Sequence, residues 1–181
     1  GDKKYIGDLT YLEHSLQTAL LAEEYLKTAA TKINPKELIL AAFFLNFRYL
    51  LVMEEVGNIN SVHNYDDMCY YFLKKIGFTE NICELVKNNF KTKRFLSSIN
   101  NKYYDNLSLD LKDTLEKNGG KMERSELISF HKDELFPWHL QLNQWHDNAK
   151  EKDIRLIQKI EDPIKYYRNI AYELSFFLLN L

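Results

Sequence analysis

The sequence has few of the residues and patterns that mark several large protein classes. It contains only two cysteines, Cys69 and Cys83, in no metal-type spacing, so we expect neither a disulfide scaffold nor a cysteine zinc site. The formal net charge is only −2, which argues against a general nucleic-acid binder. The most apolar run, 38–53, is interrupted by Asn46 and Arg48 and is too short for a membrane span. The start of the sequence has no apolar signal core, so the chain is expected to be cytoplasmic. From the charge and the short apolar run we expect neither nucleic acid nor a membrane as partner.

Helix signals dominate what the sequence does contain. Apolar residues make up 45% of the 181 residues, enough for one sizeable core. Thr10 and Glu13 form a capping box ahead of a helix with one apolar face. Asn34 and Pro35 open a second helix that is apolar nearly all round as far as Met53, and we expect it to be the buried central helix.

Further helices are predicted between the Gly, Asn and Pro turn signals. They are 66–75, 80–97, 109–117, 124–131, 137–150 and 163–180. No stretch alternates apolar and polar residues for long, so no sheet is predicted. The sequence therefore predicts an all-α fold, with residues 1–181 forming a single compact helical domain.

Six short blocks occur in order between residues 8 and 150. They are DLTYLEHSLQTA (8–19), AAFFLNFRYLL (41–51), KRFL (93–96), YYDNLS (103–108), GGKM (119–122) and WHDNAK (145–150). Together they resemble motifs of the HD-domain phosphonate oxygenases, relatives of inositol oxygenase; the fifth block reads G-G-P-M in that family. The resemblance implies an HD-domain-like helical fold, and a two-metal centre in active members.

The metal positions that the resemblance implies are mostly replaced here. The first histidine is kept as His14, whereas the other six positions hold Leu45, Asn46, Tyr49, Tyr65, Asn89 and His146. Leu45 has no donor atom, and Asn46 offers a neutral amide in place of a carboxylate. Since nothing then neutralises two buried cations, we predict that no two-metal centre forms. The sequence favours a pseudoenzyme with no cofactor.

Each of these residues is also expected to have an ordinary structural role in place of metal binding. His14 is expected to be a hydrogen-bonded buried histidine, and Asn46, Tyr65 and Asn89 to belong to a satisfied polar network. Leu45 is expected in the core. Two further histidines, His131 and His139, match no family ligand and are expected at the surface or in packing contacts.

The family's K-R-Y-L lysine, which contacts the substrate's phosphonate, falls on Lys93. With His14, Arg94 and His146, it is the predicted site for a small phosphate- or phosphonate-like anion. The alternative is that Lys93 is a solvated helix lysine.

Two other readings of the function stay open. One is an enzyme, an oxygenase or phosphohydrolase, with a rebuilt single-metal site: a weakly bound zinc or nickel ion on His14 and His146, with Asn46 or His63 as third ligand. The other is a structural subunit or homo-oligomer with a protein partner. In that case the apolar tail 170–181 would lie at an interface, although internal packing is the expected arrangement.

Overall fold

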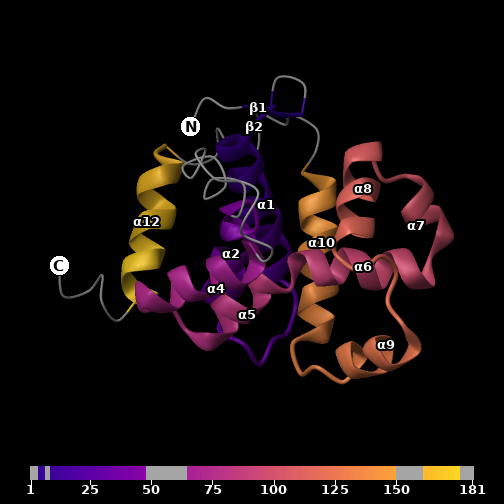
Figure 1. Cartoon of the computed structure of the whole chain (residues 1–181). Coiled ribbons are helices and arrows are strands. Elements are labelled where there is room, and N and C mark those ends of the chain that lie inside the picture. The colour runs from indigo at the N-terminus through magenta and orange to yellow at the C-terminus, as the bar shows by residue number, and fades with distance from the viewer. Residues whose placement is uncertain (1–3, 7–8, 48–64, 150–160, 176–181) are drawn as a thin grey trace.

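Helices make up nearly all of the described chain. The computed structural model describes residues 4–6, 9–47, 65–149 and 161–175, and in these ranges ten helices follow a short hairpin (Figure 1). The helices are α1 (Tyr11–Leu26), α2 (Pro35–Phe44), α4 (Tyr65–Lys75), α5 (Glu80–Lys87), α6 (Asn89–Ile99), α7 (Asn101–Asp105), α8 (Leu109–Lys117), α9 (Arg124–His131), α10 (Phe136–Asn148) and α12 (Pro163–Leu174). The all-α prediction is confirmed.

The hairpin is a small addition that the sequence did not predict. Its strands β1 (Lys4–Ile6) and β2 (Leu9–Thr10) pair antiparallel directly before α1. Strands of three and two residues are too short for an alternating pattern to be visible.

The predicted helix starts are confirmed. At α1, the backbone N–H of Glu13 donates to Oγ1 of Thr10 at 3.1 Å, and Oε2 of Glu13 accepts from the backbone N–H of Thr10 at 2.9 Å. At α2, Oδ1 of Asn34 accepts from the backbone N–H of Lys36 at 3.0 Å, with Pro35 in the first turn. Each side chain satisfies a backbone group that the first turn leaves without a helical partner.

Three predicted helix boundaries were wrong. The second helix ends at Phe44 rather than near Met53, and residues 48–53 lie outside the described part. The predicted helix 80–97 is two helices that meet at Asn88, whose Nδ2 donates to the carbonyl oxygen of Glu84 at 2.9 Å. Such local side-chain bonding competes with the regular helix. The C-terminal helix ends at Leu174, six residues short of the prediction, and α7 was not predicted.

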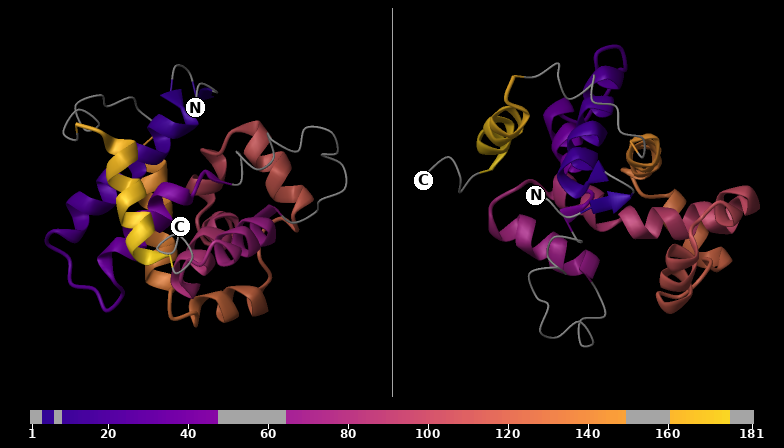
Figure 2. Two further views of the ribbon diagram at one scale, coloured as in Figure 1. Left: turned by 90° about the vertical axis from the view of Figure 1, so that its left-hand side faces the viewer. Right: turned by 90° about the horizontal axis from the view of Figure 1, so that it is seen from above.

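The main core lies where α1, α2, α5 and α10 meet. Helix α2 is buried along most of its length, as predicted, with α1 beside it, while α12 covers its outer side through Tyr167, whose ring stacks on Phe43 at 5.3 Å. A smaller cluster of Phe95, Met122 and Phe130 holds the lobe of α6, α9 and α10 (Figures 1 and 2). None of the described helices has the length and apolar character that a membrane span needs.

Candidate functional site

Asn46 connects two buried histidines from helices that are far apart in the sequence. Its Nδ2 donates to Nδ1 of His14 on α1 at 2.7 Å, and its Oδ1 accepts from Nε2 of His146 on α10 at 3.1 Å. His14 and Asn46 are 0% exposed, and His146 is 3% exposed. The two rings lie edge to face with centroids 4.5 Å apart. We refer to these three residues as the His–Asn–His bridge.

The bridge determines which nitrogen of His14 carries the proton. An amide nitrogen can only donate, so Nδ1 of His14 must accept. Nε2 of His14 lies 3.0 Å from the backbone oxygen of His146, an acceptor, so Nε2 carries the hydrogen. His14 is therefore a neutral imidazole whose two nitrogens are both engaged in hydrogen bonds. A metal at either nitrogen would have to displace one of these bonds.

The position of Asn46 follows from the end of α2. The helix stops at Phe44, and the turn after it brings the Asn46 side chain between α1 and α10. The second hydrogen of Nδ2 reaches Oγ of Ser15 at 3.2 Å. All three hydrogen-bonding groups of the amide are thus used, which is what a buried amide requires.

The structure describes two further positions at which the resemblance implies metal ligands, and neither holds a typical ligand side chain. Leu45 is a core residue, 1% exposed, as predicted. Asn89 is buried; its Nδ2 lies 3.4 Å from the backbone oxygen of Leu45, and its Oδ1 has no hydrogen-bond partner among the described residues. Tyr49, His63 and the side chain of Tyr65 lie outside the described part.

The described residues do not fit a two-metal centre. They contain no group of three or more His, Cys, Asp or Glu side chains placed to hold an ion. Asn46, at the position where the resemblance implies a carboxylate, donates a hydrogen bond and offers no negative charge. The fully buried surroundings would make an uncompensated divalent cation very costly.

Lys93 is buried, so the alternative that it is solvated was wrong. The residue is 6% exposed on α6, and its Nζ donates to Oδ1 of Asn143 at 2.9 Å and lies 3.5 Å from Oδ1 of Asp147. The hydroxyl of Tyr103 donates to Oδ2 of Asp147 at 3.3 Å. Burial, followed by the charge of Asp147, raises the pKa of Tyr103 and keeps it a neutral donor. We name these four residues the Lys93 cluster.

Sequence reasoning missed three members of this cluster. Tyr103 and Asp147 lie inside two of the six blocks, and Asn143 lies one helical turn before Asp147 on α10. A buried lysine needs a carboxylate or neutral acceptors, and this requirement would have indicated such partners if Lys93 had been predicted to be buried. His146 Nδ1 lies 3.6 Å from Oδ1 of Asp147, so the bridge and the cluster are neighbours.

Arg94 does not join His14 and Lys93. Its Nε donates to the backbone oxygen of Gly120 at 2.8 Å, and its guanidinium pairs with Glu126 at 3.1 Å. Arg94 therefore holds the loop between α8 and α9, on a different side of α6 from Lys93. The separation of Arg94 from Lys93 could not be predicted from the sequence, because it depends on how α6 is rotated about its axis between neighbouring helices.

The remaining histidines behave as predicted. His131 is exposed, with its ring 4.8 Å from that of Phe136. His139 is buried and stacks on Phe130 with ring centroids 5.3 Å apart.

Comparisons with known proteins give two relatives. No protein-family model matches the chain. The chain is 30% identical over 178 residues to the uncharacterized protein L432 of Acanthamoeba polyphaga mimivirus, covering 96% of this chain and 75% of that protein. It is 27% identical over 177 residues to the hydroxymethylphosphonate dioxygenase of Gimesia maris, covering 94% of this chain and 80% of the dioxygenase.

Proposed function

The chain belongs to the same family as the mimivirus protein L432, and from this premise we propose that it is an HD-domain pseudoenzyme, distantly related to a phosphonate dioxygenase. In this proposal it keeps the helical scaffold and performs neither oxygenase nor phosphohydrolase chemistry. The observation that carries the proposal is the His–Asn–His bridge, because it uses the retained histidine for internal hydrogen bonding.

The bridge links three parts of the helical scaffold through hydrogen bonds. It connects α1, the end of α2 and α10 through side chains that are all buried. Freeing Nδ1 of His14 for a metal would leave the amide hydrogen of Asn46 without an acceptor, at a cost of about 1–3 kcal/mol. Leu45 beside it supplies no replacement ligand. The site therefore favours the metal-free state.

Elemental analysis tests this proposal directly. Protein purified without chelator is expected to carry no stoichiometric iron, zinc, manganese or nickel, and the same is expected after incubation with each ion and desalting. The matched variant Leu45→His with Asn46→Asp, which restores the family's residue types at two positions, shows whether the scaffold can regain a metal. Two stoichiometric metals in the unmodified protein, or turnover abolished by His14→Ala, would overturn the proposal.

The single-metal alternative makes a different prediction. One zinc or nickel ion held by His14 and His146 would disappear in both His14→Ala and His146→Ala. The pseudoenzyme proposal expects these substitutions to change stability and leave metal content unchanged. A bound ion lost in both variants would favour the rebuilt enzyme.

A weak anion site at Lys93 is the second candidate function. The observation that favours it is a buried ammonium group next to the bridge. The carboxylate of Asp147 already lies 3.5 Å from this ammonium, so an incoming anion has to compete with it. Phosphate or phosphonate binding, measured by calorimetry, is thus expected to be weak, to strengthen in Asp147→Asn and to vanish in Lys93→Ala. Binding that survives Lys93→Ala unchanged would contradict this assignment.

A further inference from the structure

Tyr103 contacts the same two residues that hold the Lys93 ammonium. Its hydroxyl donates to Oδ2 of Asp147 at 3.3 Å and accepts from Nδ2 of Asn143 at 3.2 Å. Nζ of Lys93 lies 2.9 Å from Oδ1 of Asn143 and 3.5 Å from Oδ1 of Asp147. Asn143 and Asp147 belong to α10 and Lys93 belongs to α6, so Tyr103 is the member of the Lys93 cluster that comes from α7.

Helix α7, which carries Tyr103, is fixed to its surroundings mainly by polar contacts. It is five residues long, and none of these residues is buried. It lies at the outer edge of the molecule beside α6 and α8 (Figure 1), where it accepts exposed hydrogen bonds from Lys112 and Lys121. None of its residues belongs to either of the two hydrophobic clusters that the described residues form. An element with few buried apolar contacts opens locally at a lower free-energy cost than the core, so α7 is suited to move.

The rest of the Lys93 cluster stays hydrogen-bonded when Tyr103 leaves it. Strong O–H···O bonds measure about 2.7–2.8 Å, so the 3.3 Å contact between the Tyr103 hydroxyl and Asp147 is a long one. Nδ2 of Asn143 also donates to Oδ2 of Asp147 at 2.9 Å, and Lys93 keeps its bond to Asn143. The contact between α7 and α10 can therefore break without leaving these three side chains unsatisfied.

We propose that α7 acts as a lid on the Lys93 cluster, with the Tyr103 hydroxyl as its latch. The Lys93 side chain is 7% exposed, that of Asp147 is 23% exposed, and Tyr103 is half-buried, so the tyrosine and the carboxylate form the solvent side of the cluster. When the latch opens, the phenol leaves α10 and a small anion of the phosphate class reaches the ammonium. The inference deepens the anion-site candidate and rests on it for the identity of what enters, whereas the opening itself can be measured without any anion.

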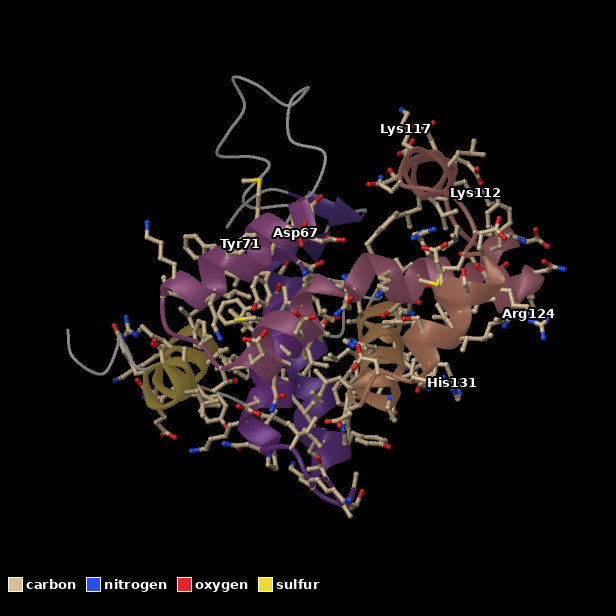
Figure 3. The ribbon with its side chains drawn as sticks, turned by 60° about the horizontal axis from the view of Figure 1, so that its bottom comes forward. Asp67, Tyr71, Lys112, Lys117, Arg124 and His131 are labelled. Atoms are coloured by element: carbon tan, nitrogen blue, oxygen red, sulfur yellow. The ribbon has the colours of Figure 1, made fainter. Side chains whose placement is uncertain are left out.

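Lysine labelling of the full chain measures how readily the lid opens. Reductive methylation at pH 7.5 is followed by mass spectrometry of the peptides, with Lys117 as the reference, since its side chain is 71% exposed and lies on α8 away from the central helices (Figure 3). In the parent protein Lys93 should react much more slowly than Lys117. Tyr103→Phe keeps the ring and removes the hydroxyl, and it should raise the rate at Lys93 about tenfold, the effect of one lost hydrogen bond on the opening equilibrium. Tyr103→Ala should raise it at least as much, with the rate at Lys117 unchanged in both variants.

The matched control is Tyr104→Ala, at the next residue of the same helix. The Tyr104 ring lies near Lys112 and Lys121, whose Nζ atoms are 5.3 and 4.6 Å from its centroid. The control removes an equally large ring from α7 without touching the latch, so the rate at Lys93 should not change. An equal rise in Tyr103→Ala and Tyr104→Ala, or no rise in either Tyr103 variant, would overturn the lid.

Hydrogen exchange of the parent protein tests the lid without any substitution. The amides of Tyr104 and Asn106 on α7 and of Thr92 on α6 each donate to the backbone oxygen four residues earlier, at 3.1, 3.2 and 2.8 Å. The two α7 amides should be less protected than that of Thr92, and equal protection would contradict a lid that opens locally.

A phosphate titration by calorimetry separates the lid from the anion site. Tighter phosphate binding in Tyr103→Phe than in the parent protein supports both. Faster labelling of Lys93 in Tyr103→Phe without phosphate binding in either protein supports the lid and removes the anion site.

Discussion

Helix α10 carries two buried histidines whose surroundings differ sharply. His146 donates to Asn46 at 3.1 Å and accepts at its backbone oxygen from His14, so it belongs to a connected polar group. His139, two turns earlier, stacks on Phe130, and neither of its ring nitrogens has a hydrogen-bond partner in the described part of the chain. The carboxylate of Asp133 lies nearby, with its Oδ2 3.5 Å from Nε2.

The difference shows two ways in which a helical core tolerates the same side chain. In the His–Asn–His bridge, hydrogen bonds replace those lost to water and make the arrangement of three elements specific. The described residues around His139 offer it no such bonds, and burial lowers its pKa to about 4, so the ring is kept in its neutral form. The burial of His146 is made possible by its hydrogen-bond partners. The burial of His139 requires its neutral form, so its contribution to stability depends on pH.

The largest expected effect comes from removing the centre of the bridge. Asn46→Leu keeps the approximate volume but leaves Nδ1 of His14 and Nε2–H of His146 buried without partners. We expect a loss of about 3–5 kcal/mol in the free energy of unfolding, measured by urea denaturation at pH 7.5. The matched control is Asn106→Leu, at an exposed asparagine, with an expected change of about 0.5 kcal/mol or less. If the two variants lose equal stability, the bridge is not a stabilising unit.

Local signals explain what the sequence predicted of the fold and the site. The helix caps at Thr10 and Asn34 depend on residues within one turn, so the pattern was sufficient. The burial of His14 followed from its place in an apolar helix face. The contact of Asn46 with His146 spans 100 residues of sequence and could not be read from periodicity. The predicted place of Arg94 beside Lys93 and His14 was wrong for the same reason, since its partners Gly120 and Glu126 are also distant in the sequence.

Acid should destabilise the protein through His139. The side chain is 2% exposed, and its pKa in the folded state, about 4, lies below the 6.5 of an unperturbed histidine. The unfolded chain therefore binds the proton first as pH falls. Stability is fully present above pH 6.5 and is lost down to pH 4, by up to about 3 kcal/mol.

The measurement is the unfolding free energy of the parent protein and of His139→Leu across this pH window. Subtracting the two curves removes the contribution of the carboxyl groups, which titrate in both proteins. The difference should grow steadily below pH 6.5. Parallel curves would mean that His139 binds its proton equally well in the folded and unfolded states.

At neutral pH the two α10 histidines should respond unequally to the same substitution. His146→Leu leaves Oδ1 of Asn46 without its donor and is expected to cost about 2–3 kcal/mol. His139→Leu breaks no hydrogen bond to the described residues and removes only the 3.5 Å contact with Asp133 and the stacking on Phe130, so we expect a change of about 1 kcal/mol or less at pH 7.5. Urea denaturation of both variants measures the two changes in the free energy of unfolding. Equal losses of stability would contradict the distinction between the two sites.

The smallest expected effect tests the same distinction beside the bridge, at Asn89. Among the described residues, its buried Oδ1 has no hydrogen-bond partner, and its Nδ2 makes one long contact of 3.4 Å with the backbone oxygen of Leu45. Asn89→Leu therefore removes a poorly satisfied amide and adds apolar volume, so the free energy of unfolding should change by about 1 kcal/mol or less, in either direction. Combining it with Asn46→Leu should give an additive loss, because Asn89 forms no hydrogen bond with the bridge residues. A loss of about 3 kcal/mol in Asn89→Leu alone would place Asn89 among the residues that hold this interior together, and the polar network expected from the sequence would then extend beyond the bridge.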